Sequence, residues 1–142
     1  MKPKTILKAS MWYFIFAMIF GVFYREVTKF TNFTGKTTLS VVHAHGVVLG
    51  TILFLILFVL SVSKNFGQGS LFSKFFKTYN IALPFMLIML IVRGATQVFN
   101  VVITFTQSAI ISGLSGLSHI IMLIAFIMLF RCLFQFCKEL EK

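Results

Sequence analysis

The sequence predicts an all-α integral membrane protein built as a four-helix bundle, and three observations support this fold class. The chain has 142 residues, of which 58% are hydrophobic and 11% are charged, whereas a soluble domain carries about 25% charged residues. It contains three acidic residues, and none of them is an aspartate. It also contains four apolar runs of about 20 residues, the length that a helix needs to cross a bilayer. We therefore expect one domain over residues 1–142, with helices at about 9–30, 39–63, 79–100 and 113–136.

The basic residues predict how these helices are oriented. The net charge is +10, and lysine and arginine are in excess on the cytoplasmic side of membrane proteins. One side of the predicted helices holds most of the 13 basic residues, namely Lys2, Lys4, Lys8, Lys64, Lys74, Lys77, Arg131, Lys138 and Lys142. The opposite side has Arg25, Lys29 and Lys36. Both termini are therefore expected in the cytoplasm, in a multi-pass protein of a bacterial plasma membrane. The lipid bilayer explains the positive charge better than a nucleic-acid partner does.

The first apolar run, from about Ala9, is rich in aromatic residues. It has a basic start, but no small-x-small cleavage site closes it, so we expect a membrane helix rather than a cleaved signal. Trp12 and Tyr13 lie where an interfacial aromatic belt is expected. The run ends near Arg25 and Glu26, which are adjacent on the helix and therefore point about 100° apart.

Two histidines distinguish the second apolar run. His43 and His45 are two residues apart, so on a helix they face nearly opposite ways, about 200° apart. His43 shares its face with Gly46 and Gly50, a small-xxx-small spacing that lets another helix approach closely. We expect His43 to point into the packed bundle and His45 to face another helix or a second subunit. Gly46 and Gly50 are the candidate contacts of a homo-oligomer.

The third apolar run carries three polar residues on one face. Arg93, Gln97 and Asn100 are spaced i, i+4 and i+7, which places them on the same side of a helix. Pro84 lies in the first third of the run, where a kink is expected. The preceding residues 64–78 mix phenylalanine with lysine, which is typical of a segment lying on the cytoplasmic leaflet.

The fourth apolar run begins with small residues and contains the third histidine. One helical stripe on it consists of Ser112, Ser115, His119, Met122 and Phe126. Such a stripe favours close packing and hydrogen bonding between helices. Near the end of this run the two cysteines are five residues apart and form no CxxC. We therefore expect them to be small apolar side chains in a reducing compartment.

The first and third runs end alike, which indicates an internal repeat. Arg25-x-x-Thr28-Lys29 resembles Arg93-x-x-Thr96-Gln97, and each is followed by a loop and a helix with a histidine in its first part. Two hairpins entering from the same side would form a parallel repeat about an axis along the membrane normal.

Ionisable residues of three helices are predicted at similar depth. With a rise of 1.5 Å per residue, His43 lies about 7 Å, and His119 about 9 Å, below the starts of their helices. Arg93 lies about 10 Å below the end of its helix by the same arithmetic. The expected topology makes all three of these ends outer ends. An ionisable residue inside the membrane is by default a functional-site hypothesis.

Imidazoles from two helices in a dry site suit metal or haem ligation. We expect His43 and His119 to be the metal or axial haem ligands, with arginines pairing with the haem propionates. The candidate cofactor-binding residues are His43, His119, His45, Arg93, Gln97, Asn100 and Arg25. The expected function is that of a haem carrier, sensor or electron-transfer subunit.

Three other hypotheses stay open. The polar residues can simply hydrogen-bond one another across helices, although such contacts average about 0.6 kcal/mol and an arginine at a helix centre costs about 2.5–3.5 kcal/mol. Arg93 and the histidines can instead form the electropositive site of a small ion or solute transporter. The glycine face can dock onto a larger membrane complex. A classical enzyme is disfavoured because no aspartate is present to orient His119 beside a serine.

Several motifs carry resemblances to known families. Phe23-Tyr24-Arg25-Glu26, Phe33-Thr34-Gly35-Lys36-Thr37 and His43-Ala44-His45 resemble an uncharacterised family of small bacterial four-helix membrane proteins, which implies a membrane protein of unknown function. His43-Ala44-His45 is also similar to the haem-copper oxidase helix whose two histidines serve two different haems. Haem A synthase and related cytochromes use paired hairpins with histidines, and His119 would match the second hairpin. The chain has no separate copper-ligand histidines and no proton-channel acid. This likeness therefore implies haem binding without oxygen reduction.

Overall fold

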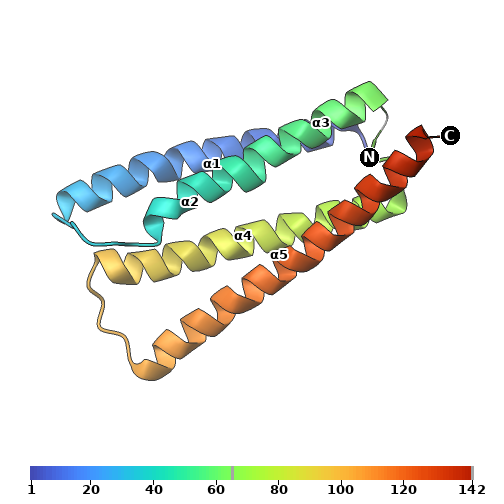
Figure 1. The fold of residues 1–142 in the computed structure, drawn as a ribbon. Helices are drawn as coiled ribbons and strands as arrows, with labels where there is room; N and C mark the ends of the chain where they lie inside the picture. The colour runs from blue at the N-terminus through green and yellow to red at the C-terminus, as the bar shows by residue number, and fades with distance from the viewer. Residues whose placement is uncertain (65, 142) are drawn as a thin grey trace.

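Two helical hairpins make up the computed structural model, which describes residues 1–64 and 66–141 (Figure 1). In the first hairpin α1 (Pro3–Phe30) is followed by one continuous helix consisting of α2 (Leu39–His45), the π-helical η1 (Gly46–Ile52) and α3 (Leu53–Lys64). The second hairpin consists of α4 (Ser70–Val98) and α5 (Phe105–Leu140). The described residues contain no strand. Four helices are long and apolar enough to cross a membrane, in agreement with the all-α fold class.

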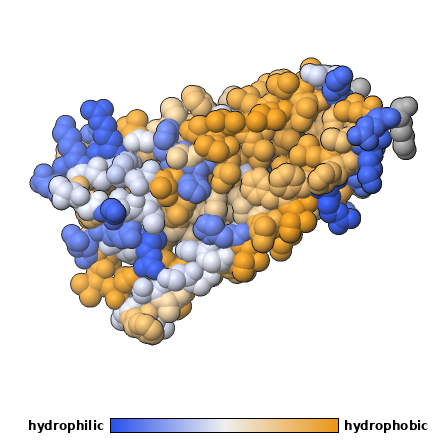
Figure 2. Space-filling model, in the orientation of Figure 1, coloured by the Kyte–Doolittle hydropathy of each residue, from blue (hydrophilic) through white to orange (hydrophobic). Residues whose placement is uncertain are grey.

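The helices pack in a chain of neighbours rather than around one common axis. α1 packs along the whole of α2, η1 and α3, α2 packs against α4, and α4 packs against α5. Both termini lie at the same end of the molecule, and α5 diverges from α4 towards its own first residues (Figure 1). Hydrophobic residues cover the middle of the molecule, and hydrophilic residues gather at its two ends (Figure 2).

The helices extend beyond the apolar runs that predicted them. α1 begins with Pro3 rather than near residue 9, since a proline in the first turn loses no hydrogen bond. α5 begins at Phe105 rather than near residue 113, because the side chain and backbone of Thr104 exchange hydrogen bonds with Gln107. α4 begins at Ser70, so most of the expected interfacial segment is helical. Hydropathy marks the lipid-compatible part of a helix, whereas caps and core contacts decide its ends.

Aromatic side chains form the core at the end of the molecule that holds the termini. Tyr79 of α4 joins three helices, because its ring lies 5.5 Å from that of Phe54 and 5.6 Å from that of Phe126. Its hydroxyl donates to the carbonyl of Leu49 at 2.8 Å. Phe75, one turn before Tyr79, is fully buried as well. These contacts explain why α4 is helical well before its apolar run begins.

The two hairpins turn in the same way. Two residues after the end of α1 and of α4 stands an asparagine with a positive φ, 50° at Asn32 and 49° at Asn100. In each case the residue after this asparagine donates its N–H to a threonine carbonyl, that of Thr28 at 2.9 Å and that of Thr96 at 3.0 Å. This is the hydrogen bond of a Schellman helix end. The resemblance between the two segments therefore extends to Arg-x-x-Thr-x-x-x-Asn.

Asn100 offers a direct test of this turn. Asn100→Val should lower the free energy of unfolding by about 1–2 kcal/mol, because a left-handed conformation strains a residue with a Cβ and most of all a branched one. Asn100→Gly should leave stability unchanged or raise it, because glycine adopts a positive φ without strain. Thermal unfolding in detergent, followed by circular dichroism, compares the two. Equal stability of the two variants would show that the backbone conformation does not matter here.

Candidate functional site

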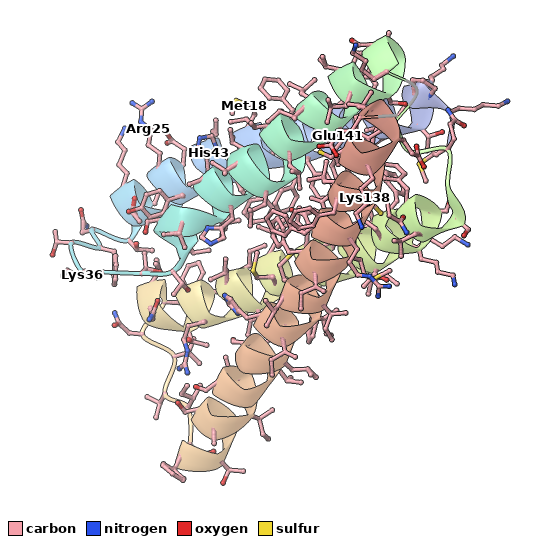
Figure 3. All side chains as sticks on the ribbon, turned by 45° about the vertical axis from the view of Figure 1, so that its right-hand side comes forward. Met18, Arg25, Lys36, His43, Lys138 and Glu141 are labelled. Atoms are coloured by element: carbon pink, nitrogen blue, oxygen red, sulfur yellow. The ribbon has the colours of Figure 1, made fainter. Side chains whose placement is uncertain are left out.

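The ring of His43 packs against α1. Its Nδ1 lies 2.8 Å from the carbonyl oxygen of Ala17, and a Cβ added at Gly21 would lie 3.1 Å from the same nitrogen. Because a carbonyl oxygen can only accept, Nδ1 is the donor in this contact, and in a neutral imidazole the lone pair is then on Nε2. His43 therefore points into the bundle, as its spacing predicts, and its neighbour there is α1 (Figure 3).

The two glycines that share the face of His43 are also used against α1. A Cβ at Gly46 would lie 3.0 Å from the Cβ of Ala17, and one at Gly50 would lie 2.5 Å from the ring of Tyr13. Both glycines are buried. The close approach predicted from the spacing therefore occurs within one chain. A homo-oligomer through Gly46 and Gly50 would first have to separate α1 from η1.

His45 lies in a helical segment that is joined to α4 on both sides of it. Seven residues before it, Thr38 donates its hydroxyl to the carbonyl of Leu90 at 2.8 Å. Four residues after it, the carbonyl of Leu49 accepts from Tyr79. These two bonds place the segment 38–49 beside residues 79–90 of α4, while Val41 and Val48, which share the helix face of His45, are 37% and 54% exposed. Its Nδ1 lies 2.8 Å from the carbonyl oxygen of Val41, which again leaves Nε2 with the lone pair.

His119 lies beside the packed face of α5, which carries the buried Ser118 and Met122. Seven residues before it Ser112 contacts Arg93, and seven residues after it Phe126 contacts Tyr79. The midpoint between these contacts on α4 is Met86, so His119 lies beside the middle of α4. His119 is exposed, and its Nδ1 lies 2.8 Å from the carbonyl oxygen of Ser115 in its own helix.

Arg93 connects α4 with the first turns of α5. Its guanidinium donates to the hydroxyls of Ser108 and Ser112 and to the carbonyl of Ser108. This is where the two helices diverge, and the long side chain of Arg93 reaches across the space between them. A Cβ added at Gly113 or Gly116 would meet nothing within 4 Å, so the first half of α5 has little packed against it.

We call the residues that line this diverging region the polar wedge: His45, Arg93, Ser112, Ser115 and His119. Pale and blue surface follows the start of α5 and reaches into the hydrophobic middle of the molecule (Figure 2). Arg93 bonds to the start of α5, whereas the hydrogen bonds of His45 and His119 among the described residues stay within their own helices. The other histidine of the HxH pair, His43, lies on the α1 side of its helix and is not brought together with His119.

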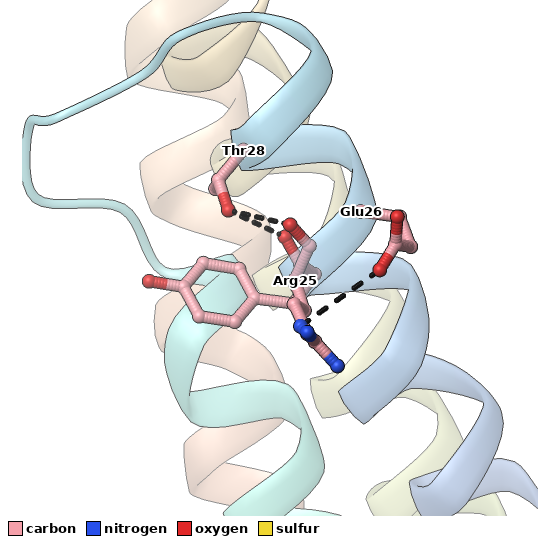
Figure 4. A network of polar contacts seen from close by, with 4 residues as sticks. Arg25, Glu26 and Thr28 are labelled. Carbon is pink, nitrogen blue, oxygen red and sulfur yellow. Dashed lines mark hydrogen bonds and ion pairs between the residues drawn. The ribbon is translucent and has the colours of Figure 1, made fainter.

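The remaining predicted site residues have other positions. Gln97 accepts the backbone N–H of Thr38 at 2.9 Å and so caps α2. Asn100 is exposed and forms the turn after α4. Arg25 has an 82% exposed side chain, and its Nε lies 3.8 Å from Glu26 (Figure 4). Such a surface ion pair contributes little to stability. The spacing Arg93, Gln97, Asn100 therefore does not correspond to one binding surface.

Hydrogen bonds from Thr37 and Thr38 to α4 were not anticipated from the sequence. Thr37 donates its hydroxyl to the carbonyl of Gly94 at 3.1 Å, and a Cβ at Gly94 would lie 2.5 Å from the backbone nitrogen of Leu39. The signal in the sequence is a glycine one position after the arginine of an apolar helix. This contact sets how far α2, and hence His45, stands from α4.

A family model described as "Protein of unknown function (DUF2871)" matches residues 3–136. The chain belongs to this family. The DUF2871 match spans α1 to α4 and most of α5, so it includes both histidines of the HxH pair, Arg93 and His119. It agrees with the expected resemblance to an uncharacterised family. No curated protein and no solved structure matches the chain.

In this member of the DUF2871 family the polar wedge offers two imidazole nitrogens and one guanidinium. The described residues contain no group of three or more His, Cys, Asp or Glu side chains that could hold a metal ion. Imidazoles on two separate helices instead suit a ligand that is itself large enough to reach both. Arg93 adds a positive charge and hydrogen-bond donors that match a carboxylate.

Proposed function

We propose that this chain is a multi-pass membrane protein that holds haem in the polar wedge. The supporting observation is the contact that each imidazole makes. Each of the three histidines has its Nδ1 2.8 Å from a backbone carbonyl oxygen. A neutral imidazole that donates from Nδ1 has its lone pair on Nε2, the arrangement that histidine ligands of metals commonly adopt.

The proposed ligands are His45 and His119, because their rings bond only to their own helices, whereas the ring of His43 is held by α1. Arg93 would pair with a propionate in place of the serines that it now contacts. His43 would support the site by holding α2 against α1. Bound haem supplies redox or ligand-binding chemistry, so the protein would act as a haem carrier, sensor or electron-transfer subunit.

We also propose that both termini are cytoplasmic. The termini lie at one end of the molecule (Figure 1), and the lysines at the start of α1, at the end of α3 and near the start of α4 belong to that end as well. The other end carries Arg25, Lys29 and Lys36. The larger number of basic residues marks the cytoplasmic side. The polar wedge would then lie in the outer half of the bilayer.

The proposal is tested by a visible spectrum and a metal analysis of the protein purified in a mild detergent. We expect a Soret band after purification or after addition of hemin, with about one iron per chain or per pair of chains. A stoichiometric metal without a Soret band would show that the protein binds a metal ion and not haem. Neither a band nor a metal after reconstitution would contradict the proposal.

A further inference from the structure

A second candidate site is a crevice between α1 and α4, away from the polar wedge. Its volume is about 430 Å³, and its walls include Ala9, Trp12 and Phe16 from α1 and Pro84 from α4. α1 packs on η1 and α3, while α4 packs on α2 and α5, so the two helices leave space between them. Pockets for small molecules typically measure about 300–1,000 Å³ and are mostly apolar. The crevice has both properties.

Two hydrogen-bonding side chains from opposite walls meet in this apolar crevice. The hydroxyl of Tyr13 donates to Oδ1 of Asn80 at 3.1 Å, and Nδ2 of Asn80 donates to the carbonyl of Phe76 at 2.8 Å. The amide has a second hydrogen, which this contact does not use. A polar hydrogen without a partner is unfavourable in an apolar surrounding. The crevice therefore presents one free donor to a ligand.

The backbone of α4 supplies an acceptor beside this donor. Pro84 has no N–H, so the carbonyl of Asn80, four residues earlier, loses its usual helical partner. Asn80 and Pro84 both line the crevice. A ligand with an oxygen on a flat ring can accept from the amide of Asn80, and in a hydroxyl form it can donate to this carbonyl.

The walls favour a flat ring over a simple acyl chain. Three aromatic residues, Trp12, Tyr13 and Phe16, line one side, and aromatic rings prefer to contact other rings in stacked or edge-on geometry. Trp12 is 64% exposed and Ile88, on the opposite wall, is 54% exposed. The crevice is thus open to the apolar surroundings of the helices. We propose that it binds the ring of a membrane-dissolved quinone, with a carbonyl oxygen on Asn80.

Trp12 is the only tryptophan of the chain, so its fluorescence reports on this site. A short-chain benzoquinone analogue is titrated into the full chain in lipid nanodiscs. We expect saturable quenching of Trp12. Tyr13→Phe and Asn80→Leu should each weaken the apparent affinity by roughly tenfold, because each removes part of the hydrogen-bonding pair. Tyr24→Phe is the matched control, since it removes a hydroxyl from the same helix outside the crevice, and it should leave the affinity unchanged.

Two further measurements separate recognition of a ring from random collision and from the binding of acyl chains. A saturated fatty acid of similar size should not compete with the quinone. Ala9→Phe, which fills the crevice, should abolish the saturation of Trp12 quenching, while the melting temperature of the protein stays within a few degrees. Quenching that is linear in every variant would show collision only. Equal competition by the fatty acid, with no effect of Asn80→Leu or Tyr13→Phe, would make the crevice an acyl-chain site. Either result overturns the quinone proposal, and neither depends on haem.

Discussion

Gly94→Ala is expected to lower the free energy of unfolding by about 1–3 kcal/mol, the typical cost of overpacking a core. The added Cβ would lie 2.5 Å from the backbone nitrogen of Leu39 and 2.6 Å from its Cγ. A side chain can rotate away from such a contact, but a backbone nitrogen cannot. α2 and α4 would therefore have to separate. Separation would also lengthen the 3.1 Å hydrogen bond from Thr37 to the carbonyl of Gly94.

Gly113→Ala and Gly116→Ala are the matched controls for this prediction. Both glycines are helical, and a Cβ at either position would meet nothing within 4 Å. These variants should be unchanged or more stable by up to about 1 kcal/mol, because alanine favours a helix more than glycine does. Titration with a denaturing detergent, followed by circular dichroism, measures all three. A Gly94→Ala variant as stable as the controls would show that α2 and α4 are not in tight contact.

Replacing His119 or His45 by alanine is expected to have the largest effect on bound haem. Each variant removes one proposed ligand nitrogen, Nε2, from the polar wedge. We expect haem affinity to fall by roughly 100-fold or more, because loss of a residue that only supports a metal ligand already lowers metal affinity or activity by about 10–100-fold. Both variants should fold normally, because His119 is exposed and the hydrogen bond of His45 is to a carbonyl of its own helix. The intensity of the Soret band at equal protein concentration is the measurement.

His43→Ala separates ligation from packing. This variant removes a ring packed on Gly21 and a 2.8 Å hydrogen bond to Ala17, so it should lower stability while the Soret band is retained. Free imidazole should restore the band in His119→Ala and have no effect on His43→Ala. A band lost only in His43→Ala, with normal folding, would move the ligand to the α1 side of the helix. A band that survives all three replacements would exclude the histidines as ligands.

The polar wedge and the crevice lie in different parts of the molecule. The polar wedge is bounded by α2, α4 and α5, and the crevice is bounded by α1 and α4. Only α4 contributes to both, and it does so through different residues. A failure of haem binding therefore leaves the quinone titration informative, and the reverse also holds.

Local patterns in the sequence were sufficient for the number of helices and for the opposite faces of His43 and His45. Hydropathy shows four apolar helices because a bilayer-length run is a property of consecutive residues. The 100° turn per residue separates His43 from His45 and joins His43 with Gly46 and Gly50, and the structure confirms both relations. These relations hold on any helix, whatever that helix packs against.

Only the tertiary structure decided which helix meets each face. The spacing of Arg93, Gln97 and Asn100 predicts one surface, yet these residues bridge to α5, cap α2 and form a turn, respectively. Tyr13 and Asn80 are 67 residues apart and no local pattern relates them, although they meet across the crevice. Such contacts depend on the angles and distances at which whole helices pack. Residues such as Gly94 and Tyr79 determine these angles and distances through contacts with segments that are distant in the sequence. They therefore cannot be derived from the periodicity of a single helix.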